Sequence, residues 1–136
     1  MGRFLAIDFG EKRVGLALSD PTKIIAKPFK SITYTDHDDL LNQISLIIEE
    51  KNVEKIILGF PKGLKGENTA QTNKVMSFFN LIKNKIIIPI VLQDERFSSV
   101  SAKKSLILQN IKTGHNKGLI DETAAAIFLQ LYLDRK

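Results

Sequence analysis

The sequence predicts an α/β fold in which helices flank a mixed five-stranded sheet. Three apolar runs near the start of the chain are separated by short turn-like segments, which is typical of an antiparallel meander. Farther along, short apolar runs alternate with stretches of helical periodicity, the pattern of βαβ units. With 136 residues, of which 43% are apolar and 26% charged, the chain is expected to form a single domain over residues 1–136.

The predicted meander consists of residues 4–9, 14–19 and 24–32. Residues 10–13 carry the turn between the first two strands, which form a hairpin. Pro28 cannot donate a hydrogen bond to a neighbouring strand. The third strand is therefore expected at an edge of the sheet.

The first predicted helix follows the meander, and Asp36 or Asp38 can cap its start. Its apolar residues recur at helical spacing: Leu40, Leu41, Ile44, Ile47 and Ile48. A buried strand at residues 56–58 comes next and stops at residues 59–61.

The second half of the chain continues the alternation of helices and strands. We expect a helix from about Asn68, a buried strand at residues 86–92, and a third helix capped by Ser98 or Ser99. The polar segment 110–118 is expected to be a mobile loop. The last helix is expected to start near Asp121.

Composition excludes several kinds of site. The chain has no cysteine and only two histidines, so disulfides, thiolate zinc sites and histidine-rich metal sites are excluded. A metal would be held mainly by carboxylates, which favour Mg²⁺ or Mn²⁺. The net charge of +5 favours a polyanionic partner. Because no apolar run is long enough to span a bilayer and no signal-peptide pattern is present, a cytoplasmic protein without membrane contact is expected.

Two aspartates come at element ends and face the expected core. Asp8 closes the first strand on the same face as Phe4 and Ala6, where a carboxylate must be paired, protonated or bound to a cation. Asp121 lies on the helical stripe of Ala125 and Phe128, which packs on the sheet. The alternatives are a turn residue for Asp8 and a helix-capping residue for Asp121.

A third acidic position follows the fifth predicted strand. By alternation only one of Asp94 and Glu95 can share the face of Asp8, and both can instead be solvated. Three inward-capable acids at strand ends and a helix start form a possible metal site, because loops there place functional groups on a rigid scaffold. Two divalent ions about 4 Å apart support in-line attack on a phosphodiester.

Basic residues surround these acids. Lys12 and Arg13 lie in the first hairpin turn, and the glycine-bearing loop 59–68 can cradle an anion at a helix start or serve as a plain connector. From Arg96 to Ile120 there are five positive residues and no acid. This block favours contact with a phosphate backbone, although a solvated helix face would look the same.

Four motifs recur in order along the chain: FLAIDFG at 4–10 continuing as EKRVGLALS, GFP at 59–61 with Gly66 and Gln71 downstream, DERFSS at 94–99, and KGLIDETAAA at 117–126. Together they resemble the YqgF family, also called RuvX, of pre-16S rRNA nucleases and Holliday-junction-resolvase-like proteins. The resemblance extends from residue 4 to about residue 128.

The resemblance implies a ribonuclease H-like fold and a metal-dependent nuclease. Related resolvases carry an acid at the end of strand four, where this chain has Gly59, so the second acid has to come from strand five. Glu95 is taken over Asp94 for this role. The implied catalytic and metal-binding residues, for one or two Mg²⁺ or Mn²⁺ ions, are Asp8, Glu95 and Asp121. The implied nucleic-acid-binding residues are Lys12, Arg13, Arg96 and Lys117.

The leading hypothesis for function is an endonuclease that processes the 5′ end of precursor 16S rRNA. One alternative is a Holliday junction resolvase acting on branched DNA, which would need a dimer to cut two strands symmetrically. Another is a non-catalytic nucleic-acid-binding module. A monomer or a weak dimer is expected.

Overall fold

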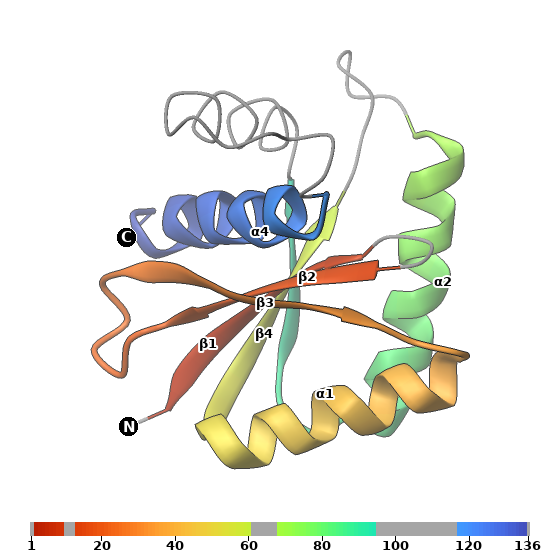
Figure 1. Ribbon diagram of the computed structural model, residues 1–136, viewed down its shortest axis with the longest axis horizontal. Helices are drawn as coiled ribbons and strands as arrows, with labels where there is room; N and C mark the ends of the chain where they lie inside the picture. Colours follow the sequence, from red (N-terminus) through yellow and green to blue (C-terminus); the bar gives the residue numbers. More distant parts are fainter. Residues whose placement is uncertain (1, 10–12, 61–67, 95–116, 136) are drawn as a thin grey trace.

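A five-stranded sheet carries helices on both faces (Figure 1). The computed structural model describes residues 2–9, 13–60, 68–94 and 117–135, with the backbone alone at 117–121. The elements in chain order are β1 (Arg3–Phe9), β2 (Arg13–Ser19), β3 (Ala26–Thr33), α1 (His37–Lys51), β4 (Val53–Phe60), α2 (Ala70–Lys85), β5 (Ile90–Asp94) and α4 (Lys117–Leu133).

The strand order is β3-β2-β1-β4-β5. β1 pairs with β2 and β2 with β3 in antiparallel fashion, whereas β4 runs parallel to both β1 and β5. This topology confirms the predicted meander followed by βαβ units. Because β1, β4 and β5 are parallel, their carboxyl ends meet at one edge of the sheet.

β3 is an edge strand, as Pro28 predicted. The register with β2 shifts between Leu16, which faces Lys30, and Ala17, which faces Pro28, so Phe29 is the extra residue of a bulge. Because β3 lies at the edge, the bulge and the missing N–H of Pro28 leave no hydrogen bond unmade in the interior of the sheet.

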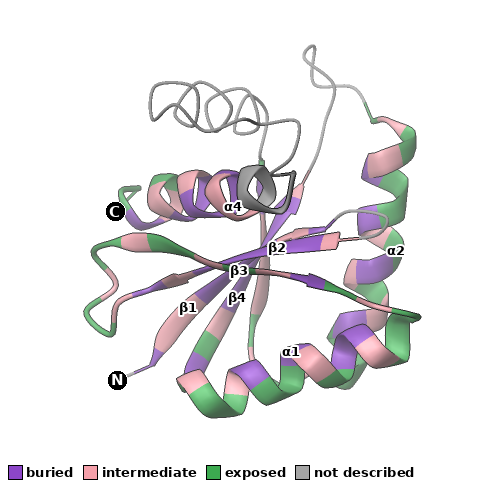
Figure 2. Ribbon diagram, viewed as in Figure 1, coloured by how far each residue is buried: buried purple, intermediate pink, exposed green. Residues whose placement is uncertain are grey.

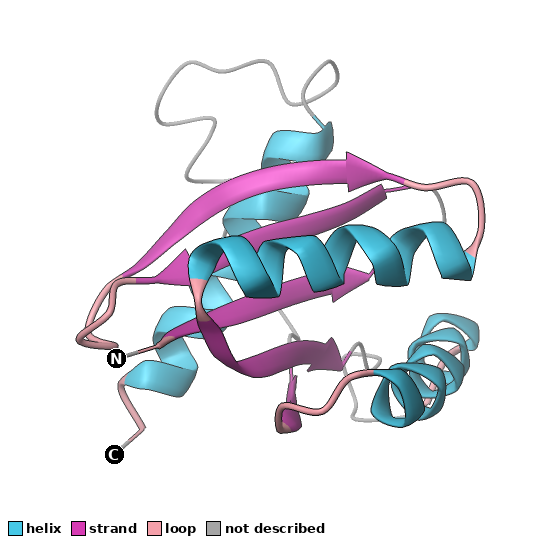
Figure 3. Ribbon diagram, turned by 90° about the horizontal axis from the view of Figure 1, so that it is seen from below, coloured by secondary structure: helices cyan, strands magenta, loops and turns pink. Residues whose placement is uncertain are grey.

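Two cores lie on the two faces of the sheet. Alternate residues of β1 supply both, because Leu5 and Ile7 pack under α1 and α2 while Ala6 packs against α4. Figure 2 shows the buried positions of each helix turned toward the strands, and Figure 3 shows α1 lying across the strands on the side opposite α4.

The helix starts follow local capping chemistry. Asp36 caps α1 by accepting a hydrogen bond of 2.8 Å from the Asp39 backbone N–H, which confirms one of the two predicted caps. Thr69 and Thr72 form a capping box at the start of α2. Among the helices that the structure describes, none is long and apolar enough to cross a membrane.

The largest differences between predicted and observed boundaries lie in the second half of the chain. The strand expected at 86–92 begins only at Ile90, and Ile87 is fully exposed. The Ile86 N–H instead caps α2, and Pro89, which lacks an N–H, contributes only its carbonyl, to the Ile56 N–H. The other error is the last helix, which begins at Lys117 rather than near Asp121, so residues 117–118 are helical and not part of a loop. The rest of the predicted loop and the predicted third helix lie outside the described residues.

Gln130 ties α4 to the connection between β2 and β3. Its Oε1 accepts a hydrogen bond of 2.9 Å from the Ala26 N–H, and its Nε2 donates one of 2.9 Å to the Ile24 carbonyl. One side chain therefore satisfies two backbone groups at the end of the β2–β3 ladder, where Ser19 pairs with Ala26.

We expect Gln130→Ala to lower the free energy of unfolding by about 1–3 kcal/mol, because the partly buried Ala26 N–H loses its acceptor. Denaturant unfolding measures this change. Leu131→Ala is the control: Leu131 is 51% exposed and is expected to cost much less. Equal costs for the two variants would contradict the role assigned to Gln130.

Asp20 organises the turn that leads into β3. Its Oδ1 accepts hydrogen bonds from the backbone N–H groups of Ile24 (2.8 Å) and Ile25 (2.9 Å), and Thr22 donates its hydroxyl to Oδ2. The hydrogen bonds from the Ile25 backbone and the Thr22 hydroxyl are the main reasons why the pKa of Asp20 lies well below its ordinary value.

A carboxyl group with a depressed pKa stabilises the fold above its unfolded-state pKa of about 3.9, and this contribution disappears as the pH falls toward the folded-state value. We therefore expect Asp20→Ala to lower the melting temperature at pH 7. The difference from the wild type should shrink steadily as the pH is lowered from about 5 to about 2. A difference that is independent of pH would contradict the assignment.

Candidate active site

Asp8 lies at the carboxyl end of β1 on the face that α4 covers. Ala6, two residues earlier, is buried against Ala125 and Ala126, so by alternation Asp8 projects from the same face. The side chain is half-buried. The face predicted for Asp8 is thus the one that the structure shows.

Glycines flank Asp8 on the neighbouring strands. Gly15 of β2 is its register partner, and the parallel pairing of Ile7 with Leu58 brings Gly59 of β4 next to it on the other side. Neither neighbour adds a side chain next to the carboxylate. Glycine at such positions permits a ligand or a second backbone to come close.

β5 presents Gln93, and not Asp94, on the face of Asp8. Val91 packs in the core under α4 and Leu92 in the opposite core, so the next two residues continue this alternation. Gln93 pairs with Gly59 and is 8% exposed, whereas Asp94 pairs with Phe60 on the other face. Of the two adjacent acids considered from the sequence, Asp94 is thereby placed away from Asp8.

Sequence reasoning did not single out Gln93. Its Oε1 accepts a hydrogen bond of 2.8 Å from Arg135 at the end of the chain. The alternation that was applied to the two acids would have placed Gln93 on the Asp8 face, but nothing local pointed to its partner 42 residues away.

α4 runs with its start toward the Asp8 end of β1. Near its last turn, Tyr132 meets Phe4 edge to face with ring centroids 6.0 Å apart, and one to two turns earlier Ala125 and Ala126 pack on Ala6. Asp121 precedes Ala125 by one turn, or about 6 Å along the helix axis. The backbone of Asp121 therefore lies toward the end of the sheet that carries Asp8, although its side chain is outside the described residues.

The predicted basic residues fall into two groups. Arg13 is half-buried at the first position of β2, on the face of Gly15 and hence of Asp8, and Lys117 begins α4. The other two predicted basic residues, Lys12 and Arg96, lie outside the described residues, as does the predicted acid Glu95. Within the described ranges no cluster of three acidic or histidine side chains is found, since two of the three predicted acids have no described side chain.

The donor chemistry at this edge fits a hard divalent cation. Asp8 offers carboxylate oxygens beside two glycines, Gly15 of β2 and Gly59 of β4, and Mg²⁺ and Mn²⁺ prefer such oxygen ligands. A second and a third acid at the start of α4 and after β5 would complete an oxygen-rich set.

Comparison with known proteins identifies the family. Residues 2–135 match the model of the family described as "RuvX: Holliday junction resolvase". A protein of Dictyoglomus turgidum named "Putative pre-16S rRNA nuclease" is 41% identical over 132 residues, which cover 97% of this chain and 94% of the relative. A protein of Desulforamulus reducens with the same name is 40% identical and covers 97% of this chain and 96% of the relative.

Solved structures share the fold. "T. thermophilus RuvC in complex with Holliday junction substrate" has a TM-score of 0.62 at 10% identity and covers 98% of this chain and 94% of its own. The structure of the fowlpox virus resolvase with Holliday junction DNA has a TM-score of 0.57 at 14% identity, with 97% of each chain covered. The sheet order, the helices on its two faces and these likenesses identify a ribonuclease H-like fold. With a match over residues 2–135 and relatives at about 40% identity, the chain belongs to the RuvX family.

Proposed function

We propose that this protein is a metal-dependent endonuclease that processes the 5′ end of precursor 16S rRNA in the cytoplasm. The observation that carries the proposal is the position of Asp8, between two glycines at the edge where β1, β4 and β5 end and toward which α4 begins. The names of the most similar relatives supply the substrate, and the family supplies the nuclease chemistry.

Asp8, Glu95 and Asp121 would bind one or two Mg²⁺ or Mn²⁺ ions. Placement of Asp94 on the opposite face of β5 supports the choice of Glu95. Bound divalent ions supply Lewis-acid activation of the attacking water and neutralise charge on the leaving oxygen. The three carboxylates would hold the ions at this edge of the sheet, and no protein general base would be required.

The basic residues near this edge would hold the phosphate backbone. Arg13 shares the face of Asp8, and Lys117 starts the helix that leads to Asp121. Lys12 and Arg96 complete the proposed set. Such contacts strengthen binding independently of sequence and make it sensitive to salt.

A second candidate function is cleavage of Holliday junctions. The description of the family and the two junction-bound structural neighbours favour it. Symmetric cleavage of a junction needs two active sites, so this activity would require the protein to act as a dimer rather than a monomer.

We expect Asp8→Asn, Glu95→Gln and Asp121→Asn each to lower the cleavage rate at least about a hundredfold, because even residues that only support metal ligands typically contribute 10–100-fold. The measurement uses labelled precursor 16S rRNA and a four-way DNA junction, each with Mg²⁺ or Mn²⁺. EDTA should abolish cleavage of the preferred substrate.

Asp94→Asn is the matched control, since Asp94 neighbours Glu95 but belongs to the opposite face. It should retain most of the activity. Loss of activity in Asp94→Asn with retention in Glu95→Gln would reverse this assignment. Efficient cutting of the junction alone would favour the resolvase, whereas metal-independent binding of both substrates without cleavage would indicate a binding module.

The metal-free protein provides a separate test of Asp121. If its carboxylate approaches that of Asp8, removing one charge relieves repulsion, so Asp121→Asn should keep or raise the melting temperature in EDTA. A helix-capping role instead predicts a loss of about 1 kcal/mol in the free energy of unfolding. Thermal unfolding of the two proteins in EDTA distinguishes these outcomes.

A further inference from the structure

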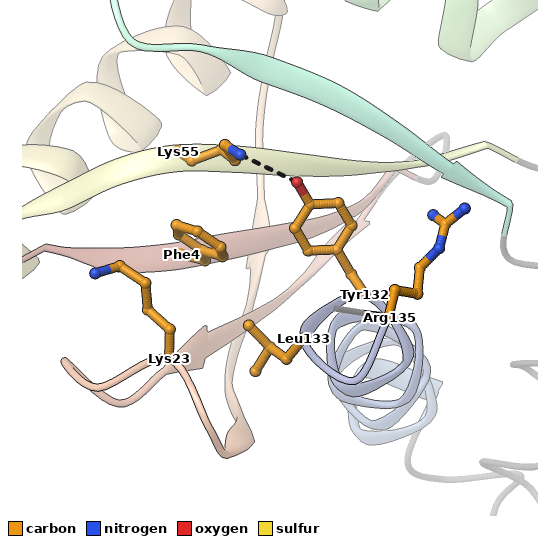
Figure 4. Close-up of a pocket in the computed structure, with 6 residues that line it drawn as sticks. All are labelled: Phe4, Lys23, Lys55, Tyr132, Leu133 and Arg135. Carbon is orange, nitrogen blue, oxygen red and sulfur yellow. Dashed lines mark hydrogen bonds between the residues drawn. The ribbon is translucent and has the colours of Figure 1, made fainter.

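A basic pocket lies where the end of α4 meets the starts of β1 and β4, away from the Asp8 edge (Figure 4). Its volume is about 340 Å³. The residues that line it are Phe4, Lys23, Lys55, Tyr132, Leu133 and Arg135. They come from four separate segments of the chain, and none was assigned a role beyond packing by the motifs.

Three cations line this pocket, and two of them, Lys55 and Lys23, lie over its aromatic rings. The Lys55 Nζ lies 5.2 Å from the centroid of Phe4 and 5.5 Å from that of Tyr132, and the Lys23 Nζ lies 5.8 Å from the Phe4 centroid. The ring faces carry partial negative charge, which offsets some of the repulsion between the ammonium groups. The aromatic rings therefore help to concentrate positive charge in one place.

Only one of the three cations has a carboxylate partner among the described residues. Lys23 pairs with Glu54 at 2.8 Å, and this hydrogen bond is the largest cause of the lowered pKa of Glu54. Lys55 donates instead to the hydroxyl of Tyr132 at 3.1 Å, and Arg135 donates to the amide of Gln93. Among the described residues the Lys55 ammonium and the Arg135 guanidinium thus have no carboxylate partner, and both keep further N–H groups for an anion.

The backbone at Lys23 is kept in an unfavourable conformation. Its φ of 63° lies in the left-handed region, which glycine adopts more readily. The turn is fixed by the Lys23 N–H, which donates to the Asp20 carbonyl at 3.0 Å. This turn places Lys23 at the rim of the basic pocket.

The chemistry of the pocket favours a phosphate group over a base. The Phe4 ring is already covered by two ammonium groups, so it does not offer a free stacking surface. The donors that remain are an ammonium, a guanidinium and the Tyr132 O–H, whose oxygen already accepts from Lys55. A phosphate, with several acceptor oxygens and negative charge, complements this set.

The pocket and the candidate active site share one face of the sheet. Phe4 and Asp8 project from the same side of β1, four residues or about 13 Å apart. Arg135 also connects the pocket to the Asp8 face of β5 through its hydrogen bond with Gln93.

We propose that this pocket binds a backbone phosphate of the nucleic-acid substrate at a distance from the scissile bond. The inference rests on the proposed function for the identity of the substrate. It assigns Lys55, Tyr132 and Arg135 to substrate binding outside the region of the acids, with Lys23 at the rim.

The test measures binding of a single-stranded RNA of about twelve nucleotides at several salt concentrations, in EDTA and in the Asp8→Asn background, so that no cleavage occurs. Lys55→Gln combined with Arg135→Gln should weaken binding at low salt and reduce the slope of log K against log salt by about 0.7. Lys55→Arg in place of Lys55→Gln should restore part of the slope because it keeps the charge.

The matched control removes the same charge elsewhere. Lys51→Gln with Lys83→Gln takes away two lysines that also face phenylalanine rings, Phe29 and Phe79, but that belong to α1 and α2 on the other face. This control should leave the slope near that of the wild type. Equal slopes for the two double variants, with melting temperatures showing both to be folded, would overturn the proposal.

A further experiment tests whether the pocket prefers the phosphate of a nucleic-acid strand or that of a free nucleotide. Adenosine 5′-monophosphate should perturb the Tyr132 ring signals in NMR spectra only weakly compared with the RNA. Strong binding of the mononucleotide with no change in the RNA slope would overturn the assignment to the substrate backbone. If the wild type cleaves neither substrate but the slope difference stands, the nuclease proposal fails and the pocket proposal survives. If the wild type cleaves a substrate but the slopes are unchanged, the nuclease proposal survives and the pocket proposal fails.

Discussion

The close packing of α4 on the sheet is the contact on which the rest of the molecule depends. Small side chains meet across it, with Ala125 and Ala126 of the helix against Ala6 and Ala17 of the strands. Small residues let a helix backbone approach its neighbour closely, so the direction of the helix is well determined. Its two ends are thereby placed over two different parts of one sheet face.

At its beginning, α4 points toward the carboxyl end of β1. Because β1, β4 and β5 are parallel, their three carboxyl ends meet at that edge. Asp8 stands there between Gly15 and Gly59, and Gln93 continues the same row. The proposed chemistry therefore requires only parallel strand direction and glycine at the two positions beside Asp8.

At its other end, α4 contributes Tyr132 and Arg135 to the basic pocket. One helix thus links the edge that we propose to bind divalent ions with the basic pocket that we propose to bind phosphate. A polyanion that passes beside α4 could contact both ends of the helix, and the net charge of +5 favours its approach. The arrangement gives a physical reason for a substrate longer than the scissile dinucleotide.

Local patterns in the sequence determined the mixed sheet, the edge position of Pro28, the Asp36 cap and the face of Asp8. Each of these follows from residues close together in the chain, through alternation, helical spacing or capping. The row that contains Gln93 and the pocket around Lys55 were decided only by the tertiary structure. They depend on strand register and helix docking between segments far apart in sequence, and local periodicity carries no record of which remote residues will meet.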